Sequence, residues 1–503
     1  MKKVLFLWVI LVCLTGVFAM NSCGDSNHVC TLDTNISSSA TWIDGNTYVL
    51  LSDINVTGSG TVLTISPGAV VKYGPTSLNV LNGGRIVATG TAAKRIYFLS
   101  CRDQNVFAGV SNADTSTIPG CSGPPNGADY KHALWIQSDA EMTSGDDLAF
   151  LTIGDANQAI QLDLSIGAVH DNNFFNIKQQ NPAFTHIGIY TTAGSSAAFY
   201  DNVFQNFSTG YGLFLDGGAA ASNIFNNRFD NLSGGVGIYL PQNFSGNIYN
   251  NLFENPLTIS IFNNATFTGT VYNNMFVNLG AGNIAIFNNA TFEGLTRRNL
   301  FANVSTAFSG VFSGTVSHNA FFNVATHGGS AANHAADQNS ATGFTTDPFI
   351  ADNTDRNFLL NTVSTGGQKL ADAGGVDSNS IDLNNFFNLR TTQNGNKLDT
   401  NKVDIGYHYD QNAPYVVVRS PSDFNSLTGT QSIDFNVESG FGIASGITAA
   451  LAYSTTSSGS GTSILSQALS AFACSALPVA SCSYAWDTTS VTDGNYFVRL
   501  AGT

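Results

Sequence analysis

Acidic side chains are the first candidates for chemistry in this chain, because calcium-assisted proton abstraction needs several carboxylates grouped around one metal ion and a base beside it. In a repeating chain, such a group arises when acidic residues recur at the same position of successive repeats. Asp163 lies 11 residues before the phenylalanine of its repeat, whereas Asp216 lies 13 residues before its own. The unequal spacing predicts that these carboxylates do not stack, and we expect no acidic row.

The basic and histidine side chains share no common position either. Arg297 and Arg298 are adjacent, and we interpret them as part of a solvated turn. His170, His186 and His318 lie at unrelated positions of their repeats and are interpreted as bend residues. No catalytic residue is therefore assigned, and no cofactor is expected apart from the calcium considered next.

Three aspartates towards the end of the repeating region are weak candidates for a metal site, namely Asp347, Asp352 and Asp355. Carboxylate oxygens are ligands that calcium prefers. Aspartate in such a place is more often a turn or capping residue, whose side chain bonds the nearby backbone. Calcium binding and a purely structural role therefore stand as alternative hypotheses for these residues.

The elements that must position any site are set by a five-residue motif, Asn-x-Phe-x-Asn, which occurs seven times between residues 172 and 323. Its phenylalanines lie 20–30 residues apart. A repeat of this length is one supersecondary unit that buries its apolar side only by stacking on its copies. The motif residues are Asn172, Phe174, Asn176, Asn202, Phe204, Asn206, Asn227, Phe229, Asn231, Asn251, Phe253, Asn255, Asn274, Phe276, Asn278, Asn299, Phe301, Asn303, Asn319, Phe321 and Asn323.

Short alternating apolar runs, cut by Gly, Asn or Ser, predict two or three strands in each repeat and no helix. The chain is thus predicted to be all-β, with each repeat forming one coil of a right-handed parallel β-helix and coils about 4.8 Å apart. The motif phenylalanines should point inward and stack. The asparagines two positions away should face the same side, at bends that admit left-handed backbone, and form hydrogen-bonded ladders.

Changes in this pattern divide the chain into five regions. They are a signal peptide (1–19), an N-terminal end unit (20–45), the β-helix (46–344, with a polar insertion at 101–132), a closing section that shields the other end (345–412) and a β-sandwich (413–503). The sandwich is predicted from strand-sized runs about 12–20 residues apart. Fewer than seven strands are evident, so the sandwich is predicted to be incomplete, with its closing strand beyond Thr503.

Export is predicted from the first 19 residues, in which Lys2 and Lys3 precede an apolar stretch and a small-x-small cleavage site ending at Ala19. We expect a secreted or cell-surface protein. Lipidation of Cys23 is an open alternative for its anchoring. No later run approaches 18 apolar residues, so no transmembrane helix is expected. A net charge of −15 with 19 Lys plus Arg argues against a nucleic-acid partner.

Six cysteines remain after the signal peptide, and they fall into three local couples. In an exported chain this spacing predicts the disulfides Cys23–Cys30, Cys101–Cys121 and Cys474–Cys482. The couples lie far apart in the sequence, which argues against a zinc site, because a metal needs its ligands together.

Several stretches resemble exported right-handed parallel β-helix proteins of the pectin-lyase-like superfamily. Residues 62–68 (VLTISPG) and 83–90 (GGRIVATG) resemble their opening coils, and 347–350 (DPFI) with 404–409 (DIGYHY) resemble their closing section. Residues 485–489 (AWDTT) and 493–496 (DGNY) resemble bacterial or archaeal Ig-like modules. The resemblance implies a fold that carries lyases, hydrolases, epimerases, adhesins and passive surface proteins alike.

The catalytic motifs of the polygalacturonase-like members are not matched. Those motifs run Asn-Thr-Asp, Asp-Asp, Gly-His-Gly and Arg-x-Lys. This chain has Asp146-Asp147 before Asn353-Thr-Asp355, in the opposite order, and only His327-Gly-Gly329 is similar to the third motif. A two-carboxylate hydrolase site is therefore not assigned.

The expected function is adhesion, glycan binding or envelope display by an exported, non-catalytic β-helix protein, with cell-surface glycans or polysaccharide as the partner. The alternative is a polysaccharide-active lyase, hydrolase or epimerase whose groove residues come from different coils. A stacked acidic row on one face would favour the enzyme.

Overall fold

The computed structural model describes residues 28–328, apart from 105–112, 126–128, 179–185, 193 and 217–221. Beyond residue 328 it describes 334–335, 338–339, 349, 360, 370–371, 373, 390–392, 399, 403–410, 415–420, 430–438, 448–454, 462–468, 473–474, 479–489 and 497–502. Every element in the described part is a β-strand, and no helix there is long and apolar enough to span a membrane. The chain divides into two compact units, 1–244 and 245–503.

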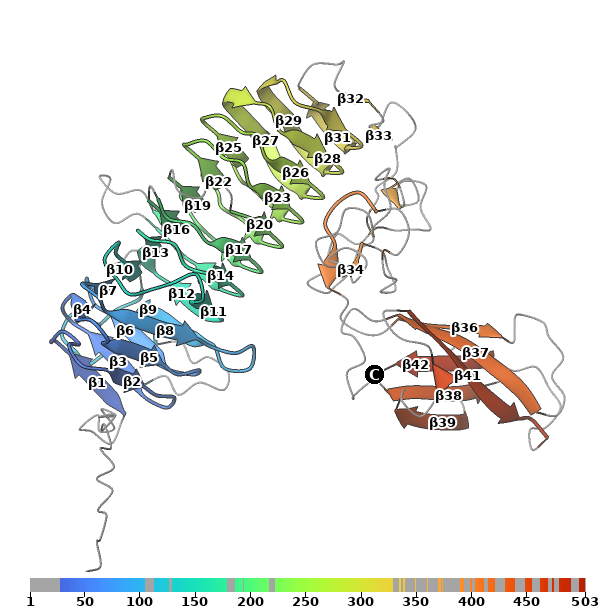
Figure 1. Ribbon diagram of the computed structural model, residues 1–503, viewed down its shortest axis with the longest axis horizontal. Helices are drawn as coiled ribbons and strands as arrows, with labels where there is room; N and C mark the ends of the chain where they lie inside the picture. Colours follow the sequence, from blue (N-terminus) through green and yellow to red (C-terminus); the bar gives the residue numbers. More distant parts are fainter. Residues whose placement is uncertain are drawn as a thin grey trace, which may run out of the picture. The chain divides into compact units, whose positions relative to one another are not determined.

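The first unit is a parallel β-solenoid in which each coil contributes a first, a second and a third strand (Figure 1). The first strands are β2 (Ala40–Trp42), β5 (Val62–Ile65), β8 (Arg85–Thr89), β11 (Asp147–Ala149), β14 (Ala168–His170), β17 (Ala198–Tyr200) and β20 (Ile224–Phe225). The second strands are β3 (Thr47–Leu50), β6 (Val70–Tyr73), β9 (Ile96–Ser100), β12 (Leu151–Gly154), β15 (Asn173–Phe175), β18 (Val203–Gln205) and β21 (Arg228–Asp230). The third strands are β4 (Ile54–Thr57), β7 (Ser77–Leu81), β10 (Tyr130–Ile136), β13 (Ala156–Leu162), β16 (Ile187–Thr191), β19 (Gly210–Leu215) and β22 (Gly235–Leu240).

The region predicted as an N-terminal end unit already pairs like a coil. Its strand β1 (Val29–Leu32) runs parallel to β3, and β2 runs parallel to β5.

The second unit continues the same plan with strands that merge across the bends. Its coils are built from β23 (Asn247–Tyr249), β24 (Leu252–Glu254), β25 (Ile259–Asn263), β26 (Thr270–Tyr272), β27 (Met275–Phe292), β28 (Leu295–Arg297), β29 (Leu300–Phe312), β30 (Val316–Ser317), β31 (Ala320–Thr326), β32 (His334–Ala335) and β33 (Gln338–Asn339). All the described pairings among these strands are parallel. The parallel β-helix predicted from the repeat is therefore confirmed at the level of a parallel solenoid.

The motif phenylalanines form the predicted internal stacks. All seven are at most 1% exposed. Phe174, Phe204 and Phe229 stack in the first unit with ring centroids 4.8–4.9 Å apart. In the second unit, the stack Phe253, Phe276, Phe301 and Phe321 has centroid spacings of 4.9–5.3 Å.

The first asparagine of each motif forms a buried ladder. The Asn274 Nδ2 donates to the Asn299 side-chain oxygen at 3.0 Å and to the Ile248 and Tyr272 carbonyls at 2.9 and 3.1 Å. Its own side-chain oxygen accepts from the backbone N–H and the side-chain amide of Asn251, at 2.9 and 3.0 Å. The same amide-to-amide bonds join Asn172, Asn202 and Asn227 in the first unit and continue from Asn299 to Asn319 in the second.

The second asparagine also forms a ladder, but on the outside, which corrects the predicted inward position. All seven second asparagines have φ between +49° and +61°. This left-handed geometry ends the alternation of the strand and turns the side chain outward. The outer amides still stack, for example from Asn323 to Asn303 at 2.8 Å and from Asn303 to Asn278 at 2.9 Å.

Described residues of the closing section pack on the flank of the second unit. Described residues Leu360, Leu370 and Ile405 bury themselves against outward-facing residues of the second strands, namely Leu252, Met275, Val277, Leu300, Ala302 and Ala320. The positions that flank the motif Phe change from polar to apolar there. Arg228 and Asp230 flank Phe229, whereas Leu300 and Ala302 flank Phe301.

Polar contacts hold this section in place. The Asn250 amide donates to the His408 carbonyl at 2.8 Å, and the Asn273 amide donates to the Asp404 carbonyl at 2.9 Å. The His408 Nε2 lies 2.8 Å from an Asp399 carboxylate oxygen, with both side chains at most 2% exposed. These contacts join the closing section to the bends that precede the buried ladder.

The C-terminal region forms two antiparallel sheets. One contains β36 (Tyr415–Ser420), β37 (Thr430–Glu438), β41 (Val479–Asp487) and β40 (Ala473–Cys474), and the other contains β39 (Thr462–Ala468), β38 (Thr448–Ser454) and β42 (Phe497–Gly502). Tyr453 of β38 contacts Trp486 of β41 with ring centroids 5.5 Å apart. Strands β39 and β40 were not among the predicted strand runs.

We predict that Asn274→Ala destabilises the chain by about 3 kcal/mol or more, because it strands several buried groups that each cost about 1–3 kcal/mol when unpaired. Asn303→Gly is the matched control in the outer ladder. Its side chain is partly exposed and its φ of +55° suits glycine, so we expect a loss within about 1 kcal/mol. Urea unfolding followed by circular dichroism measures both, and equal losses would contradict the separate roles of the two ladders.

Candidate functional site

The outward side of the third strands in the first unit carries two rows of side chains in continuous register, all of them partly exposed except Ile187, which is buried at 3% exposed. One row, at strands β10, β13, β16, β19 and β22, is Trp135, Gln161, Tyr190, Phe214 and Tyr239. The other, three residues earlier in each strand, is His132, Gln158, Ile187, Tyr211 and Val236. Because parallel coils repeat at about 4.8 Å, each row is a straight line along the stack. We call this surface the aromatic face.

Four of its rings form one contiguous cluster. Phe214 contacts Tyr190, Tyr211 and Tyr239 edge to face, with centroids 5.2, 5.0 and 4.8 Å apart. Tyr211 stacks on Tyr239 at 5.1 Å. The rings therefore support one another and present a fixed apolar surface that needs little ordering when a partner binds.

A third, polar row runs beside the rings at the ends of the third strands. Backbone bonds place Asp163 beyond Ile136, Thr192 beyond Leu162 and Asp216 beyond Thr191. Asp163, Thr192 and Asp216 thus occupy the same position of three consecutive coils. The predicted difference in position between Asp163 and Asp216 is wrong, although Thr192 lies between them and their carboxylates are two coils apart.

The error has a simple geometric cause. From this row to the next motif Phe the connection is 11 residues at Asp163, 12 at Thr192 and 13 at Asp216. Each coil lengthens its bend by one residue without disturbing the stacked strands. The shared position of Asp163, Thr192 and Asp216 is therefore missed when residues are counted from the motif Phe, and it is found when they are counted from the third strand.

Asp163 holds the aromatic face together at one end. Its carboxylate accepts from the Trp135 indole N–H at 2.7 Å, from the Gln161 amide at 2.9 Å and from the Thr192 hydroxyl at 3.1 Å. These three bonds fix the orientation of the indole ring. Asp163 is therefore a positioning residue for Trp135.

Asp216 is less fully engaged. Among the described residues, its carboxylate receives side-chain bonds only from the Tyr190 hydroxyl at 3.4 Å and from the Gln242 amide at 3.3 Å. Partial burial, and then the nearby Asp216 charge, raise the pKa of Tyr190, so this hydroxyl stays protonated at neutral pH. Asp216, Tyr190 and Gln242 thus offer both acceptors and donors beside the rings.

A second acidic pair lies at the bend before the buried ladder. Asp171 and Asp201 each precede the first motif Asn directly, with φ of +56° and +55°, and so occupy equal positions of adjacent coils. Their neighbour Arg95 donates to the Thr152 hydroxyl at 3.0 Å and to the Asp171 carbonyl. Arg95, Asp171 and Asp201 line a hollow of about 300 Å³. The expectation of no acidic row is wrong here as well.

The arginine and histidine residues that the sequence assigned to turns and bends have different outcomes. Arg298 is buried, 1% exposed, and donates to the Asn273 side chain at 3.0 Å, so its assignment to a solvated turn is wrong. Burial lowers the pKa of Arg298 to about 9. His318 lies at a bend with φ of +57°, whereas His170 belongs to β14 and stacks on Tyr200 at 4.6 Å. The buried His186 contacts the Thr209 hydroxyl through its Nε2.

The calcium candidates Asp347, Asp352 and Asp355 lie outside the described residues. Within the described part of the chain, no group of three or more His, Cys, Asp or Glu residues is arranged to hold a metal.

The disulfide Cys101–Cys121 is present as predicted and closes the polar insertion. Cys30 and Cys482 are also disulfide-bonded, and their predicted partners, Cys23 and Cys474, have side chains outside the described set. Cys474 does lie opposite Cys482 in the pairing of β40 with β41.

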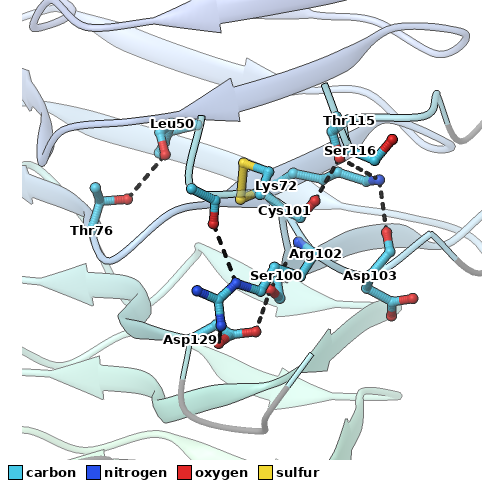
Figure 2. Close-up of a disulfide and its surroundings, with 12 residues drawn as sticks. Leu50, Lys72, Thr76, Ser100, Cys101, Arg102, Asp103, Thr115, Ser116 and Asp129 are labelled. Atoms are coloured by element: carbon cyan, nitrogen blue, oxygen red, sulfur yellow. Dashed lines mark hydrogen bonds and ion pairs between the residues drawn. A yellow bond between two sulfur atoms is a disulfide. The ribbon is translucent and has the colours of Figure 1, made fainter. Parts of the chain in front are cut away.

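The insertion buries a lysine that no sequence motif marks (Figure 2). The Lys72 Nζ donates to the Asp103 and Ala113 carbonyls at 2.7 and 3.1 Å and to the Thr115 hydroxyl at 3.1 Å. Burial lowers its pKa to about 8. Lys72 lies at an outward position of β6 and is nevertheless buried, because the insertion lies over it. The insertion is therefore a cover for this second strand rather than a free loop.

Buried carboxylates lie near this cover. Asp129 accepts from the Ser100 hydroxyl at 2.6 Å and from Arg102 at 3.2 Å (Figure 2). Asp155 is 1% exposed, and one of its carboxylate oxygens has no hydrogen-bond partner among the described residues. Burial, and then the charges of Asp103 and Asp129, raise the pKa of Asp155 to about 6, against the hydrogen bond it accepts from Asn176. This cluster is closed to ligands.

Comparison of the chain with protein-family models, curated proteins and solved structures finds no match. Function must therefore be argued from the surfaces of the chain itself.

We predict that Asp155→Asn stabilises the chain by about 1–3 kcal/mol at pH 7. Burial raises the pKa of Asp155 from about 3.9 to about 6, which means that its charged form destabilises the folded state at pH 7 by about that amount, and asparagine removes the charge. In the wild type the folded state binds the extra proton between pH 4 and 6, so stability falls as pH rises through that window. Asparagine tolerates the φ of +64° at this position. The unfolding curves of the wild type and of Asp155→Asn should therefore differ at pH 7 and converge at pH 4. An equal difference in stability at the two pH values would contradict the prediction.

Proposed function

We propose that this chain is an exported, glycan-binding β-helix protein of the pectin-lyase-like superfamily that holds polysaccharide on its aromatic face. The observation that carries the proposal is the alignment of the ring rows with the polar row of Asp163, Thr192 and Asp216. Adhesion to a glycan-bearing surface, or display on the cell envelope, is the biological role that such binding would serve.

The chemistry of sugars suits this surface. A pyranose ring has apolar C–H faces, which pack on aromatic rings, and a rim of hydroxyls, which both donate and accept hydrogen bonds. The cluster of Tyr190, Tyr211, Phe214 and Tyr239 supplies the first kind of contact. The Asp216 carboxylate and the Gln242 amide supply the second.

The remaining parts of the proposal concern location and display. The Cys101–Cys121 disulfide is typical of an oxidising, extracytoplasmic compartment. The two antiparallel sheets of the C-terminal region, with Tyr453 of one against Trp486 of the other, support an Ig-like sandwich. In this proposal the sandwich is a display module and the solenoid carries the binding surface.

We predict that the double variant Tyr190→Ala/Phe214→Ala loses at least tenfold in affinity for any polysaccharide that the wild type binds. The binding screen uses the full chain against β-glucan, mannan, xylan, methyl-esterified galacturonan and polygalacturonate by affinity electrophoresis. Phe225→Ala is the matched control, because it removes a partly exposed outward ring from a first strand, where it stacks on Tyr200 at 4.8 Å. No binding in the screen, or equal loss in the control, would contradict glycan binding by the aromatic face.

A second candidate function is polysaccharide cleavage at the Asp171–Asp201 pair. Two carboxylates on adjacent coils, about 4.8 Å apart at the backbone, beside a hollow of about 300 Å³, are the geometry from which an acid and a nucleophile are built. Against it, the Asp171 carboxylate is held by His170 at 2.8 Å, and the Asp201 carboxylate is bonded by Asn226. We therefore rank binding above cleavage.

We predict no release of reducing or unsaturated sugars from the same polymers, with or without calcium. Reducing-end assays and absorbance of unsaturated products measure this directly. Turnover by the wild type that is lost in both Asp171→Asn and Asp201→Asn, while binding persists, would establish the second function instead.

A further inference from the structure

We infer that the aromatic face selects uncharged polysaccharide over polyuronate and holds it lengthwise, with one sugar on each coil. This inference rests on the proposed glycan binding and adds the class and direction of the ligand. It is carried by the charge of the three rows and by their regular spacing.

The charge of the face is entirely negative at neutral pH. The three rows, from Trp135 to Tyr239, contain the carboxylates of Asp163 and Asp216 and no Lys or Arg. His132 is the one residue of the rows that could carry positive charge, and burial lowers its pKa, which keeps the ring neutral. Lys131, next to it, pairs with Asp53 at 3.8 Å.

A polyuronate would meet this charge repeatedly. Its carboxylates recur at every sugar, so a chain laid along the face would bring like charges beside both Asp163 and Asp216. Like charges in contact oppose binding, and the net charge of −15 on the whole chain adds to the repulsion at low ionic strength. Recognition of polyuronate would need Arg or Lys at these positions, because those side chains form charge-assisted bonds to carboxylates.

The direction of the ligand is set by the register of the coils. Trp135, Gln161, Tyr190, Phe214 and Tyr239 are paired coil by coil, so their side chains repeat at about 4.8 Å, close to the length of one sugar in an extended chain. A polymer that lay along the stack would keep the same contact at each step. A polymer that crossed the stack would meet the polar row only once, at a single coil.

Asp216 is the residue on which selectivity should depend most. Asp163 already accepts three hydrogen bonds, whereas the bonds received by Asp216 are 3.3 and 3.4 Å long. Asp216 therefore retains acceptor capacity for a sugar hydroxyl. The carboxylate of a uronate sugar has no proton to donate to Asp216 and would be repelled by its charge.

The test compares β-glucan and mannan each with its own C6-oxidised form, and methyl-esterified galacturonan with polygalacturonate, so that the two members of each pair differ in carboxylate charge on the same backbone. For the full wild-type chain at low salt, we expect the neutral polymer to bind at least tenfold more tightly and the difference to shrink as salt is added. Asp216→Lys should raise affinity for the oxidised polymer several-fold. Affinity for neutral oligosaccharides should increase with length until about five sugars, one for each coil, are bound.

The outcomes separate this inference from the proposed function. Equal or tighter binding of the oxidised polymer, sensitive to Tyr190→Ala/Phe214→Ala, would overturn the selectivity and leave glycan binding intact. Binding that does not increase beyond one or two sugars would overturn the lengthwise arrangement. If Tyr190→Ala/Phe214→Ala leaves the affinity for both the neutral and the oxidised polymer unchanged, the proposed function itself is refuted. Circular dichroism of each variant confirms that the outward substitutions leave the fold unchanged.

Discussion

The buried asparagine amide at one bend of each coil from Asn172 to Asn319 is the interaction on which the repeating part of this structure depends. Each amide donates to the next rung and to backbone carbonyls, while its oxygen accepts from the rung before. Aspartate would lack the donors, and serine would be too short to reach. Because the bend residue before it has positive φ, the strand can turn there without leaving a backbone group unpaired. The stacked phenylalanines fill the core that this ladder keeps in register.

This constraint explains why the surfaces are so regular. Once the inner ladder fixes each coil on its neighbour, every outward position becomes a straight row, whatever the length of the bends between strands. Parts of the outward side of the second strands are covered, by the insertion over Lys72 of β6 in the first unit and by the closing section over Met275 and Leu300 in the second. The outward side of the third strands from β10 to β22 keeps partly exposed rings instead. The proposed function depends on this difference in cover.

The sequence alone predicted the solenoid, the Phe stacks, the asparagine ladders and the Cys101–Cys121 bond, because each arises from a local repeat or a short closed loop. It did not predict the aromatic face. Asp163 and Asp216 align only when residues are counted from the third strand, and the motif Phe was the wrong origin for that count. Asp171 and Asp201 stood at equal positions in the sequence, directly before Asn172 and Asn202, and could have been found. The burial of Lys72 and Arg298 depended on distant segments, the insertion and the closing section, that no local pattern specifies.

Regularity also bears on the choice between binding and cleavage. A catalytic site needs unlike groups converging on one bond, with pKa values driven apart by their environments. A repeated row does the opposite, since it offers the same weak contact at every coil and distinguishes no single bond of a polymer. The aromatic face spans five successive coils and would bind a long ligand through several similar contacts, each of which adds to the affinity. The Asp171–Asp201 pair does place two carboxylates at equal positions of adjacent coils, yet these carboxylates are occupied by His170 and Asn226. The repeated geometry of this solenoid therefore favours holding a long ligand over cutting it.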